Sequence, residues 1–187
     1  MGDRAVFLDR DGTINVEKNY LYKIADFELI PGSLEALKLL SENNVLIYVV
    51  TNQAGIARGH YTERDFQIIT DHMLEFFEKQ CVNIEQVLYC PHHPEASVPE
   101  YKKNCNCRKP ANGLIKSVVE SMKLNVNELA LIGDKNTDIE AGLSLGMKCY
   151  LVETGYGSTE KATTKATFIK PNLHEAVKHL LKEWRLS

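Results

Sequence analysis

The sequence predicts an α/β fold in which a doubly wound parallel sheet carries helices on both faces. Short runs that are apolar throughout, at residues 5–8, 45–50 and 129–132, are typical of strands buried on both faces of a parallel sheet. Segments in which apolar residues recur at helical spacing separate these runs. Such alternation of strands and helices indicates βα units, and therefore a parallel sheet.

Length and composition fit one domain that spans residues 1–187. The chain is 44% hydrophobic and 25% charged, which is enough apolar content for a real core. Its net charge of -3 gives no reason to expect a nucleic acid as a partner. No apolar segment approaches the roughly 20 residues of a membrane span, and a strand begins before any signal-like core could form. We therefore expect a monomeric, cytoplasmic protein without nucleic-acid or membrane partners.

Local signals divide the first half of the chain into elements. Residues 14–28 are polar with scattered aromatic residues and read as a long loop. A helix opens at Ser33, its expected N-cap, and ends before the strand at 45–50. Residues 55–59 are expected to form a flexible connector, and the longest helix starts at Thr62.

The second half departs from the βα pattern once. A strand at 86–89 is followed by a loop at 90–110 that contains cysteine, histidine and proline. A helix is expected at 113–122, and Thr137 with Glu140 forms an expected capping box for the next one. The last expected elements are strands at 149–152 and 168–169 and a helix at 173–184.

Polar residues follow the ends of three expected strands. Asp9 and Asp11 come directly after the first strand, and Asp134 follows the strand at 129–132. The strand at 45–50 is followed by neutral side chains that can bind phosphate oxygens: Thr51, Asn52 and Gln53. Right-handed crossovers bring strand ends to one sheet edge, where open α/β sheets bind ligands. Taken alone, the two acids at the first strand also fit an ordinary turn.

The three acids suggest a hard divalent cation, and carboxylates combined with phosphate and water suit Mg²⁺. We expect Asp9 and Asp134 to bind it through their side chains and Asp11 through its backbone carbonyl. Asp9 is then the expected nucleophile, which forms an aspartyl-phosphate, while Asp11 acts as general acid and base. Asp138, in the first turn of a helix, either supports the site or caps the helix. The expected stabilisers of phosphoryl charge are Thr51, Asn52 and Lys109.

The loop after the first strand is close enough to the acids to contact a ligand. The residues concerned are Glu17, Lys18, Asn19 and Tyr20. A solvated connector is the competing interpretation. Cations beyond those needed for one phosphoryl group could reach a second phosphate, or could be solvated surface charges: Lys18, Arg58, Arg108 and Lys135.

Three sulfurs and one imidazole in the loop at 90–110 predict a structural zinc site. The expected ligands are Cys90, His92, Cys105 and Cys107, a set that suits tetrahedral Zn²⁺ and leaves no open position for catalysis. His93 is a rival to His92, and an unmetallated cysteine cluster is the other interpretation. Cys81 and Cys149 are expected to be small core residues. Arg108 and Lys109 follow Cys107 directly, so the metal would fix the base of a cationic clamp.

In this order, the motifs resemble those of the haloacid dehalogenase (HAD) superfamily of phosphatases. They are the stretch 9–13 (DRDGT), Thr51 with Asn52, Lys109, and Gly133-Asp134 with Asp138. The resemblance covers essentially the whole chain and implies an HAD-type, Rossmann-like fold, a Mg²⁺ cofactor and phosphomonoester hydrolysis.

Within the superfamily, the zinc loop and the absence of a large cap domain resemble one family, the D-glycero-D-manno-heptose 1,7-bisphosphate 7-phosphatases. The matching stretches are 9–15, 51–59, 90–94, 107–110 and 133–135. The resemblance implies removal of the C7 phosphate in the synthesis of nucleotide-activated heptose, which feeds lipopolysaccharide or other surface glycans. Histidinol-phosphate phosphatases, or enzymes for other small phosphomonoesters, are the nearest alternative.

Two other classes of protein share parts of this pattern. A phosphoacceptor signalling domain also places acids, a threonine and a lysine on a doubly wound sheet, but it does not need a zinc clamp. A zinc-containing nucleic-acid module is disfavoured by the balanced charge and the lack of interleaved aromatic residues.

Overall fold

A six-stranded parallel sheet forms the centre of the computed structural model, which describes residues 3–186. The strands lie in the order β3-β2-β1-β4-β5-β6. Their bounds are Ala5–Leu8 (β1), Leu46–Asn52 (β2), Gln86–Cys90 (β3), Leu129–Gly133 (β4), Lys148–Val152 (β5) and Phe168–Lys170 (β6). The order reverses at β1, so the predicted doubly wound arrangement is confirmed.

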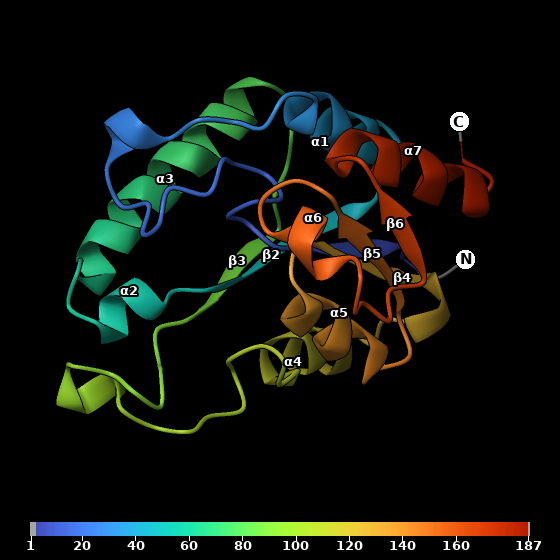
Figure 1. Ribbon diagram of the computed structural model, residues 1–187. Helices are drawn as coiled ribbons and strands as arrows, with labels where there is room; N and C mark the ends of the chain where they lie inside the picture. Colours follow the sequence, from blue (N-terminus) through green and yellow to red (C-terminus); the bar gives the residue numbers. More distant parts are fainter. Residues whose placement is uncertain (1–2, 187) are drawn as a thin grey trace.

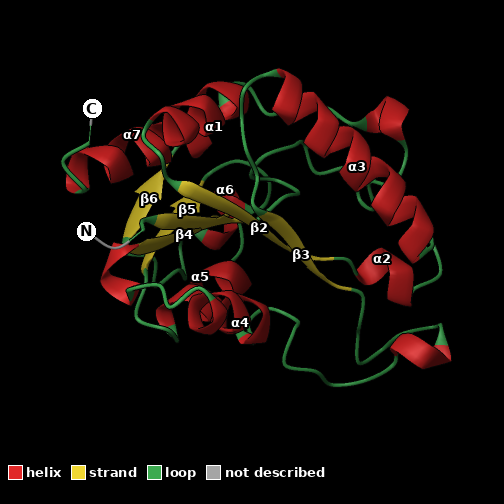
Figure 2. Ribbon diagram, turned by 180° about the vertical axis from the view of Figure 1, so that it is seen from behind, coloured by secondary structure: helices red, strands yellow, loops and turns green. Residues whose placement is uncertain are grey.

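Helices cover both faces of the sheet, as Figures 1 and 2 show from opposite sides. On one face lie α1 (Ser33–Glu42) and α7 (Leu173–Glu183), and on the other α4 (Gly113–Ser121) and α5 (Asn136–Leu143). The long helix α3 (Glu63–Lys79) lies beyond β2 and β3 on the side of α1. Two short helices, α2 (Ala54–Ala57) and α6 (Gly157–Glu160), complete the set, and none of the described helices is long and apolar enough to cross a membrane.

Each face of the sheet has its own hydrophobic core. Val6 and Leu8 of β1 face the core beneath α1 and α7, whereas Ala5 and Phe7 face the core beneath α4 and α5. Side chains alternate between the faces of a strand, so β1 can be apolar at every position only because both faces are covered. All four residues are fully buried. The unbroken apolar runs therefore mark the strands that carry the site.

Several local expectations are wrong, each for a local reason. Gly32, with φ of 88°, is the N-cap of α1, and Ser33 is the first helical residue, whose hydroxyl instead donates to the carbonyl of Thr13. The connector expected at 55–59 begins inside α2, where the side chain of Tyr61 packs directly against Gly55. Asp138, not Thr137 with Glu140, caps α5: its carboxylate accepts a hydrogen bond from the backbone N–H of Lys135, because the helix starts two residues earlier than expected.

The bounds of the second strand and the exposure of one cysteine also differ from expectation. The second strand is Leu46–Asn52, so Thr51 and Asn52 are its last residues and not part of a following loop. Their backbone still pairs with β3, which extends the ladder by two positions. Cys149 is buried as expected, but Cys81 is exposed because it follows the end of α3 with a positive φ of 61°.

Candidate active site

The ends of β1, β2 and β4 meet at one edge of the sheet. Leu8 is in register with Val49 of β2 and with Ile132 of β4, so Asp9 lies near the carboxyl ends of both neighbours, two residues before the end of β2 and level with the last residue of β4. Its backbone N–H donates to the carbonyl of Ile132 at 2.9 Å. The crossovers therefore place the polar residues after these strands around Asp9.

Three carboxylates converge at this edge. Asp9, Asp134 and Asp138 each offer an oxygen, and these oxygens lie within 4.8 Å of one another. Burial, followed by the charges of its acidic neighbours, raises the pKa of Asp134 to about 8. Burial also raises the pKa of Asp9 to about 6, against the opposing effect of Lys109. So much unneutralised acid in a buried position fits a divalent cation bound by hard oxygen ligands.

The two oxygens of Asp134 have different surroundings. Oδ2 accepts a hydrogen bond from the backbone N–H of Tyr156 at 2.8 Å. Oδ1 is buried and has no hydrogen-bond partner among the described residues. A Cβ atom on Gly12 or Gly155 would overlap Oδ2, so both backbones approach this carboxylate closely. The free Oδ1 is the atom on which a bound cation would supply the missing partner.

Lys109 forms ion pairs with the other two acids. Its ammonium lies 2.6 Å from Asp9 Oδ1 and 2.7 Å from Asp138 Oδ1, and only 4% of the residue is exposed. Burial alone would lower its pKa, but the two carboxylates outweigh that effect and raise it. The backbone of Lys109 is held by Asn52, whose amide donates to the Lys109 carbonyl and accepts from its N–H, each at 3.0 Å. Asp138 thus both caps α5 and supports the site.

Asp11 is held by three donors. Arg10 Nη2 donates to Oδ2 at 2.8 Å, Asn15 Nδ2 to Oδ1 at 2.9 Å, and Gln53 Nε2 to Oδ2 at 3.1 Å. Burial opposes ionisation of Asp11, but the Arg10 charge and these hydrogen bonds together lower its pKa. The carboxylate is therefore in its anionic form. The role of Arg10 was missed by sequence reasoning, because an arginine beside two acids has no pattern that distinguishes a buried ion pair from a surface one.

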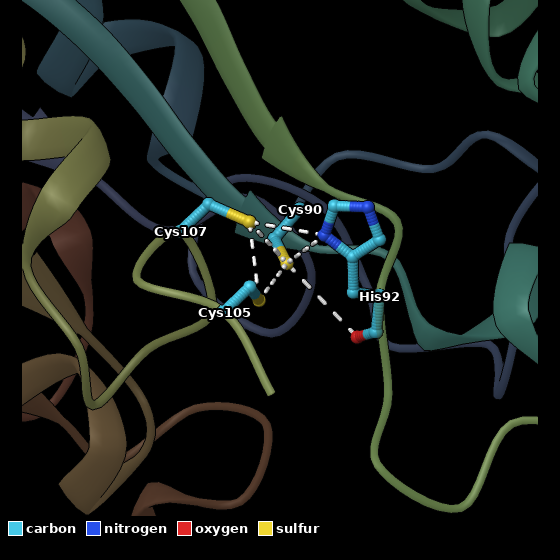
Figure 3. A group of neighbouring side chains, drawn as sticks. All are labelled: Cys90, His92, Cys105 and Cys107. Carbon is cyan, nitrogen blue, oxygen red and sulfur yellow. Dashed lines mark hydrogen bonds between the residues drawn. The ribbon is translucent and has the colours of Figure 1, made fainter. Parts of the chain in front are cut away.

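The four expected zinc ligands form a compact cluster, shown in Figure 3. Sγ of Cys107 lies 2.9 Å from Sγ of Cys90 and 3.3 Å from Sγ of Cys105, and His92 Nδ1 lies 3.2 Å from it. The ligand atoms of the four residues come within 4.8 Å of one another, which suits a tetrahedral metal. His93 is not part of the group, because its Nδ1 accepts the backbone N–H of Glu95.

The cluster lies at the root of an extended loop. Figure 1 shows this loop running from the end of β3 out to a single helical turn at Pro99–Tyr101 and back to α4. Its outer part is attached to α2 through two hydrogen bonds, from the N–H groups of Ser97 and Val98 to the carbonyl of Ala57. Lys109, which pairs with Asp9 and Asp138, is two residues beyond the last cysteine of the cluster.

A cavity of about 450 Å³ opens above the acids. The residues that line it and that the sequence predicted are Asp9, Asp11, Glu17, Asn19, Tyr20, Thr51, Asn52, Gln53, Arg108, Lys109, Lys135 and Asp138. Lys18 and Arg58 do not line it: Lys18 pairs with Glu28 at 2.6 Å, and Arg58 donates to the hydroxyl of Tyr20 at 2.8 Å. These two cations therefore lie outside the cavity.

Sequence reasoning also missed the loop after β5. Tyr156 lines the cavity, its backbone N–H holds Asp134, and Lys135 Nζ lies 4.3 Å from the centre of its ring. The hydroxyl of Thr154 donates to the carbonyl of Gly12 at 2.7 Å, which ties this loop to the one that carries Asp11. Asp9 and Asp134 were predicted because they follow the carboxyl ends of parallel strands. The same argument applied to the residues that follow β5 would have found this loop.

The fold and the acid cluster define an HAD-like hydrolase. Residues 106–176 match the family described as HAD-hydrolase-like. A D-glycero-alpha-D-manno-heptose-1,7-bisphosphate 7-phosphatase of Photorhabdus laumondii is 42% identical over 84% of this chain and 86% of its own length. A D-glycero-beta-D-manno-heptose-1,7-bisphosphate 7-phosphatase of Escherichia coli is 37% identical over 96% of this chain and 94% of its own.

Structural comparison gives the same result. The crystal structure of D,D-heptose 1,7-bisphosphate phosphatase from B. bronchiseptica, complexed with magnesium and phosphate, superposes with a TM-score of 0.86 at 27% identity. The match covers 96% of this chain and 99% of that one. The chain belongs to the family of heptose-1,7-bisphosphate 7-phosphatases within the HAD-like hydrolases. The expected fold and family are confirmed, and the protein is a phosphomonoester hydrolase.

Proposed function

We propose that the protein removes the C7 phosphate of D-glycero-D-manno-heptose 1,7-bisphosphate during the synthesis of nucleotide-activated heptose. The observation that carries the proposal is the position of Lys109 between Asp9 and Asp138, on the floor of a cavity whose rim bears further cations. A buried nucleophile next to a fixed ammonium suits attack on an anionic phosphoryl group. The names of the relatives support the choice of sugar.

Asp9 is the proposed nucleophile. One of its oxygens is bound by Lys109, which leaves the other to attack phosphorus and form an aspartyl-phosphate. The residues proposed to hold Mg²⁺ are Asp9 and Asp134 through their side chains and Asp11 through its backbone carbonyl. When bound there, Mg²⁺ would offset the charge repulsion between carboxylate and phosphate. Lys109 and the hydroxyl of Thr51 would stabilise the negative charge on the phosphoryl oxygens.

Asp11 is the proposed general acid and base. As an anion held by Arg10, Asn15 and Gln53, it is already in the form that takes a proton from the water attacking the aspartyl-phosphate. The negative charge of an incoming phosphate raises the proton affinity of a neighbouring carboxylate. Substrate binding would therefore favour the protonated form of Asp11 that the first step needs, in which the proton goes to the leaving sugar oxygen.

The cations at the rim of the cavity are proposed to bind the phosphate that does not react. Arg108 donates to the carbonyl of His92 at 3.3 Å, so the zinc loop fixes its guanidinium at the cavity. Lys135 also lines the cavity, with its ammonium 3.6 Å from Glu17 and over the ring of Tyr156. Two cations in addition to Lys109 suit a substrate with two phosphates better than one with a single phosphate. We propose that Glu17, Asn19 and Tyr20 contact the sugar that joins the two phosphates.

The proposed metal in the loop is a structural Zn²⁺ bound by Cys90, His92, Cys105 and Cys107. Four protein ligands leave no position for a reacting water. The metal would hold the chain in place directly before Arg108 and Lys109. Its effect on catalysis would therefore pass through the position of these two cations.

We further propose that the enzyme acts as a monomer in the cytoplasm. Every residue assigned to the site comes from one chain, so no second subunit is needed to complete it. A pathway that leads to a nucleotide-activated sugar finds its nucleotide donor in the cytoplasm.

The test is phosphate release by the wild-type protein and by Asp9→Asn, with Mg²⁺. The panel contains the α and β anomers of the heptose 1,7-bisphosphate, histidinol phosphate and a simple sugar monophosphate. We expect repeated turnover and the highest kcat/KM for one of the two heptose anomers, with Asp9→Asn inactive. A preference for histidinol phosphate would replace the proposed substrate by the alternative one. Release of no more than one phosphate per chain would indicate a phosphoacceptor domain.

A further inference from the structure

Among the residues that line the cavity is a buried tyrosine that the mechanism above does not use. Tyr61 is 6% exposed and follows α2, and its hydroxyl is hydrogen-bonded to Oε1 of Gln53. Gln53 is 2% exposed and lies one residue beyond the end of β2. Burial raises the pKa of Tyr61, so its hydroxyl keeps its proton and can act as a donor.

The orientation of the Gln53 amide follows from its other partners. Arg10 Nη2, which can only donate, lies 3.4 Å from Oε1, whereas the carboxylate of Asp11, which can only accept when ionised, lies 3.1 Å from Nε2. The amide oxygen must therefore face Arg10 and Tyr61, and the amide nitrogen must face Asp11. With this orientation fixed, the Tyr61 hydroxyl must be the donor in its hydrogen bond with Oε1 of Gln53.

The same amide fixes the direction of a second hydroxyl. Nε2 of Gln53 also donates to Oγ1 of Thr51 at 2.7 Å. Because Oγ1 already accepts this hydrogen bond, the hydroxyl hydrogen of Thr51 is left to point elsewhere. Thr51 lines the cavity beside Asp9, where a phosphoryl oxygen would be its acceptor. The hydrogen bonds from Tyr61 to Gln53 and from Gln53 to Thr51 thus set the direction in which the Thr51 hydroxyl donates into the cavity.

We propose that Tyr61 is a positioning residue that acts through Gln53 to aim the Thr51 hydroxyl at the phosphoryl group and to hold the carboxylate of Asp11. The proposal rests on the function proposed above for Thr51 and Asp11. Without the Tyr61 hydroxyl, the 3.4 Å contact to Arg10 is the one hydrogen bond that Oε1 of Gln53 keeps among the described residues, and the amide can rotate. Thr51 and Asp11 then lose the geometry that matters most in the transition state.

The test is Tyr61→Phe, which removes the hydroxyl and keeps the ring that stacks on Tyr22 at 5.5 Å. With p-nitrophenyl phosphate as substrate the result does not depend on which sugar the enzyme prefers. We expect kcat to fall about tenfold while KM stays within about twofold, because the lost interaction acts mainly in the transition state. Tyr150→Phe is the matched control: Tyr150 is also buried and its hydroxyl contacts His179 at 3.2 Å, in a different part of the core. It should leave kcat unchanged.

A double-mutant cycle separates positioning through Gln53 from a general loss of structure. Gln53→Met keeps the length of the side chain and removes both hydrogen-bonding groups. In that background, Tyr61→Phe should change kcat by less than about twofold, because the path through the amide is already broken. An equal loss of kcat in both backgrounds, or no loss in the single variant, would overturn the proposal.

Binding of vanadate to the Mg²⁺-loaded protein, measured by calorimetry, gives a readout that needs no turnover, because vanadate takes the geometry of the phosphoryl group in the transition state. Tyr61→Phe should weaken this binding through the misdirected Thr51 hydroxyl while the affinity for inorganic phosphate changes little, and unchanged vanadate affinity would count against the proposal. If the wild-type protein binds vanadate but hydrolyses none of the sugar bisphosphates, the proposed function fails while this inference is still decided by the binding data.

Discussion

The ammonium of Lys109 lies 2.6 Å from Oδ1 of Asp9, although 100 positions separate the two residues in the chain. The same ammonium lies 2.7 Å from Asp138, and all three groups are buried. Because one cation pairs with two acids, we expect Lys109→Met to leave both carboxylates without a positive partner. The free energy of unfolding should fall by about 3–5 kcal/mol, and kcat should fall as well.

Denaturant unfolding with and without Mg²⁺ measures the first effect, and phosphate release measures the second. Lys116→Met is the control, since that lysine is exposed on α4 and only pairs with Glu120 at 3.7 Å. Stability equal to that of the wild type in Lys109→Met would mean that the buried pair is not formed in solution.

Asp9→Asn removes the proposed nucleophile but keeps its size and its ability to accept a hydrogen bond from Lys109. We expect kcat to fall by at least ~10³-fold while the fold is retained, because an amide oxygen does not form the phosphoenzyme. Rapid acid quench with labelled substrate should trap phosphate on the wild-type protein and none on Asp9→Asn. Asp26→Asn, at an exposed position, should behave as the wild type.

The acid cluster predicts a pH-dependent effect of Mg²⁺ on stability. The folded-state pKa is raised to about 6 for Asp9 and about 8 for Asp134, above the unfolded value of about 3.9. Between these values the metal-free folded protein holds protons that the unfolded chain has released. The contribution of these two carboxyl groups to the free energy of unfolding is therefore fully present below about pH 4, and it is lost as the pH rises through about 6 and 8.

A bound cation replaces those protons, so the increase in melting temperature caused by Mg²⁺ should become larger from about pH 5 to about pH 9. Thermal scans with Mg²⁺ and with a chelator at each pH give this difference directly. Asp134→Asn should lose most of the Mg²⁺ effect. If Mg²⁺ raised the melting temperature by the same amount at both ends of this pH range, the proposal that these acids bind the metal would be contradicted.

For the proposed zinc site, we expect that removal of the metal lowers both stability and activity. The purified protein should contain a single zinc ion per chain, measured by plasma emission spectrometry. Its removal by a strong chelator should lower the melting temperature by roughly 5 °C or more, since the loop would lose the cross-link that the proposed metal makes between Cys90 and Cys107. Substrate affinity should fall with it, because Arg108 and Lys109 follow directly.

Cys105→Ser should reproduce the effect of zinc removal, whereas Cys81→Ser should not, because Cys81 is exposed and outside the cluster. A zinc-free protein with unchanged melting temperature and kinetics would show that the loop does not depend on the metal.

Arg108 predicts the preference for a second phosphate. Arg108→Ala should lower kcat/KM for the bisphosphate by roughly 10- to 100-fold and leave that for a monophosphate nearly unchanged, because a charged hydrogen bond to the remote group is lost. The control is Lys102→Ala, which removes an exposed cation of the same loop. If Arg108→Ala lowered both values equally, the guanidinium would act on the reacting phosphate instead.

Much of the site could be predicted because strand ends are local features. An apolar run that stops at Asp9, Thr51 or Asp134 marks a strand end, and a parallel sheet gathers such ends at one edge whatever the rest of the chain does. The cysteine and histidine cluster could be predicted equally well, since three sulfurs and an imidazole within one loop have few other uses. Composition and spacing by themselves predicted the class of fold, the sheet edge at which the acids gather and the cluster of Cys90, His92, Cys105 and Cys107 that could hold a metal ion.

Only the tertiary structure decided which side chains meet and in which direction they point. Lys18 turns to Glu28 and away from the cavity, while Tyr156 enters it from a loop that no motif marked. The pairing of Arg10 with Asp11, and the amide direction that Tyr61 imposes on Gln53, depend on elements packed from distant parts of the sequence. The physical reason is that residue spacing sets periodicity along one element, whereas side-chain orientation is set by the partners that long-range packing supplies.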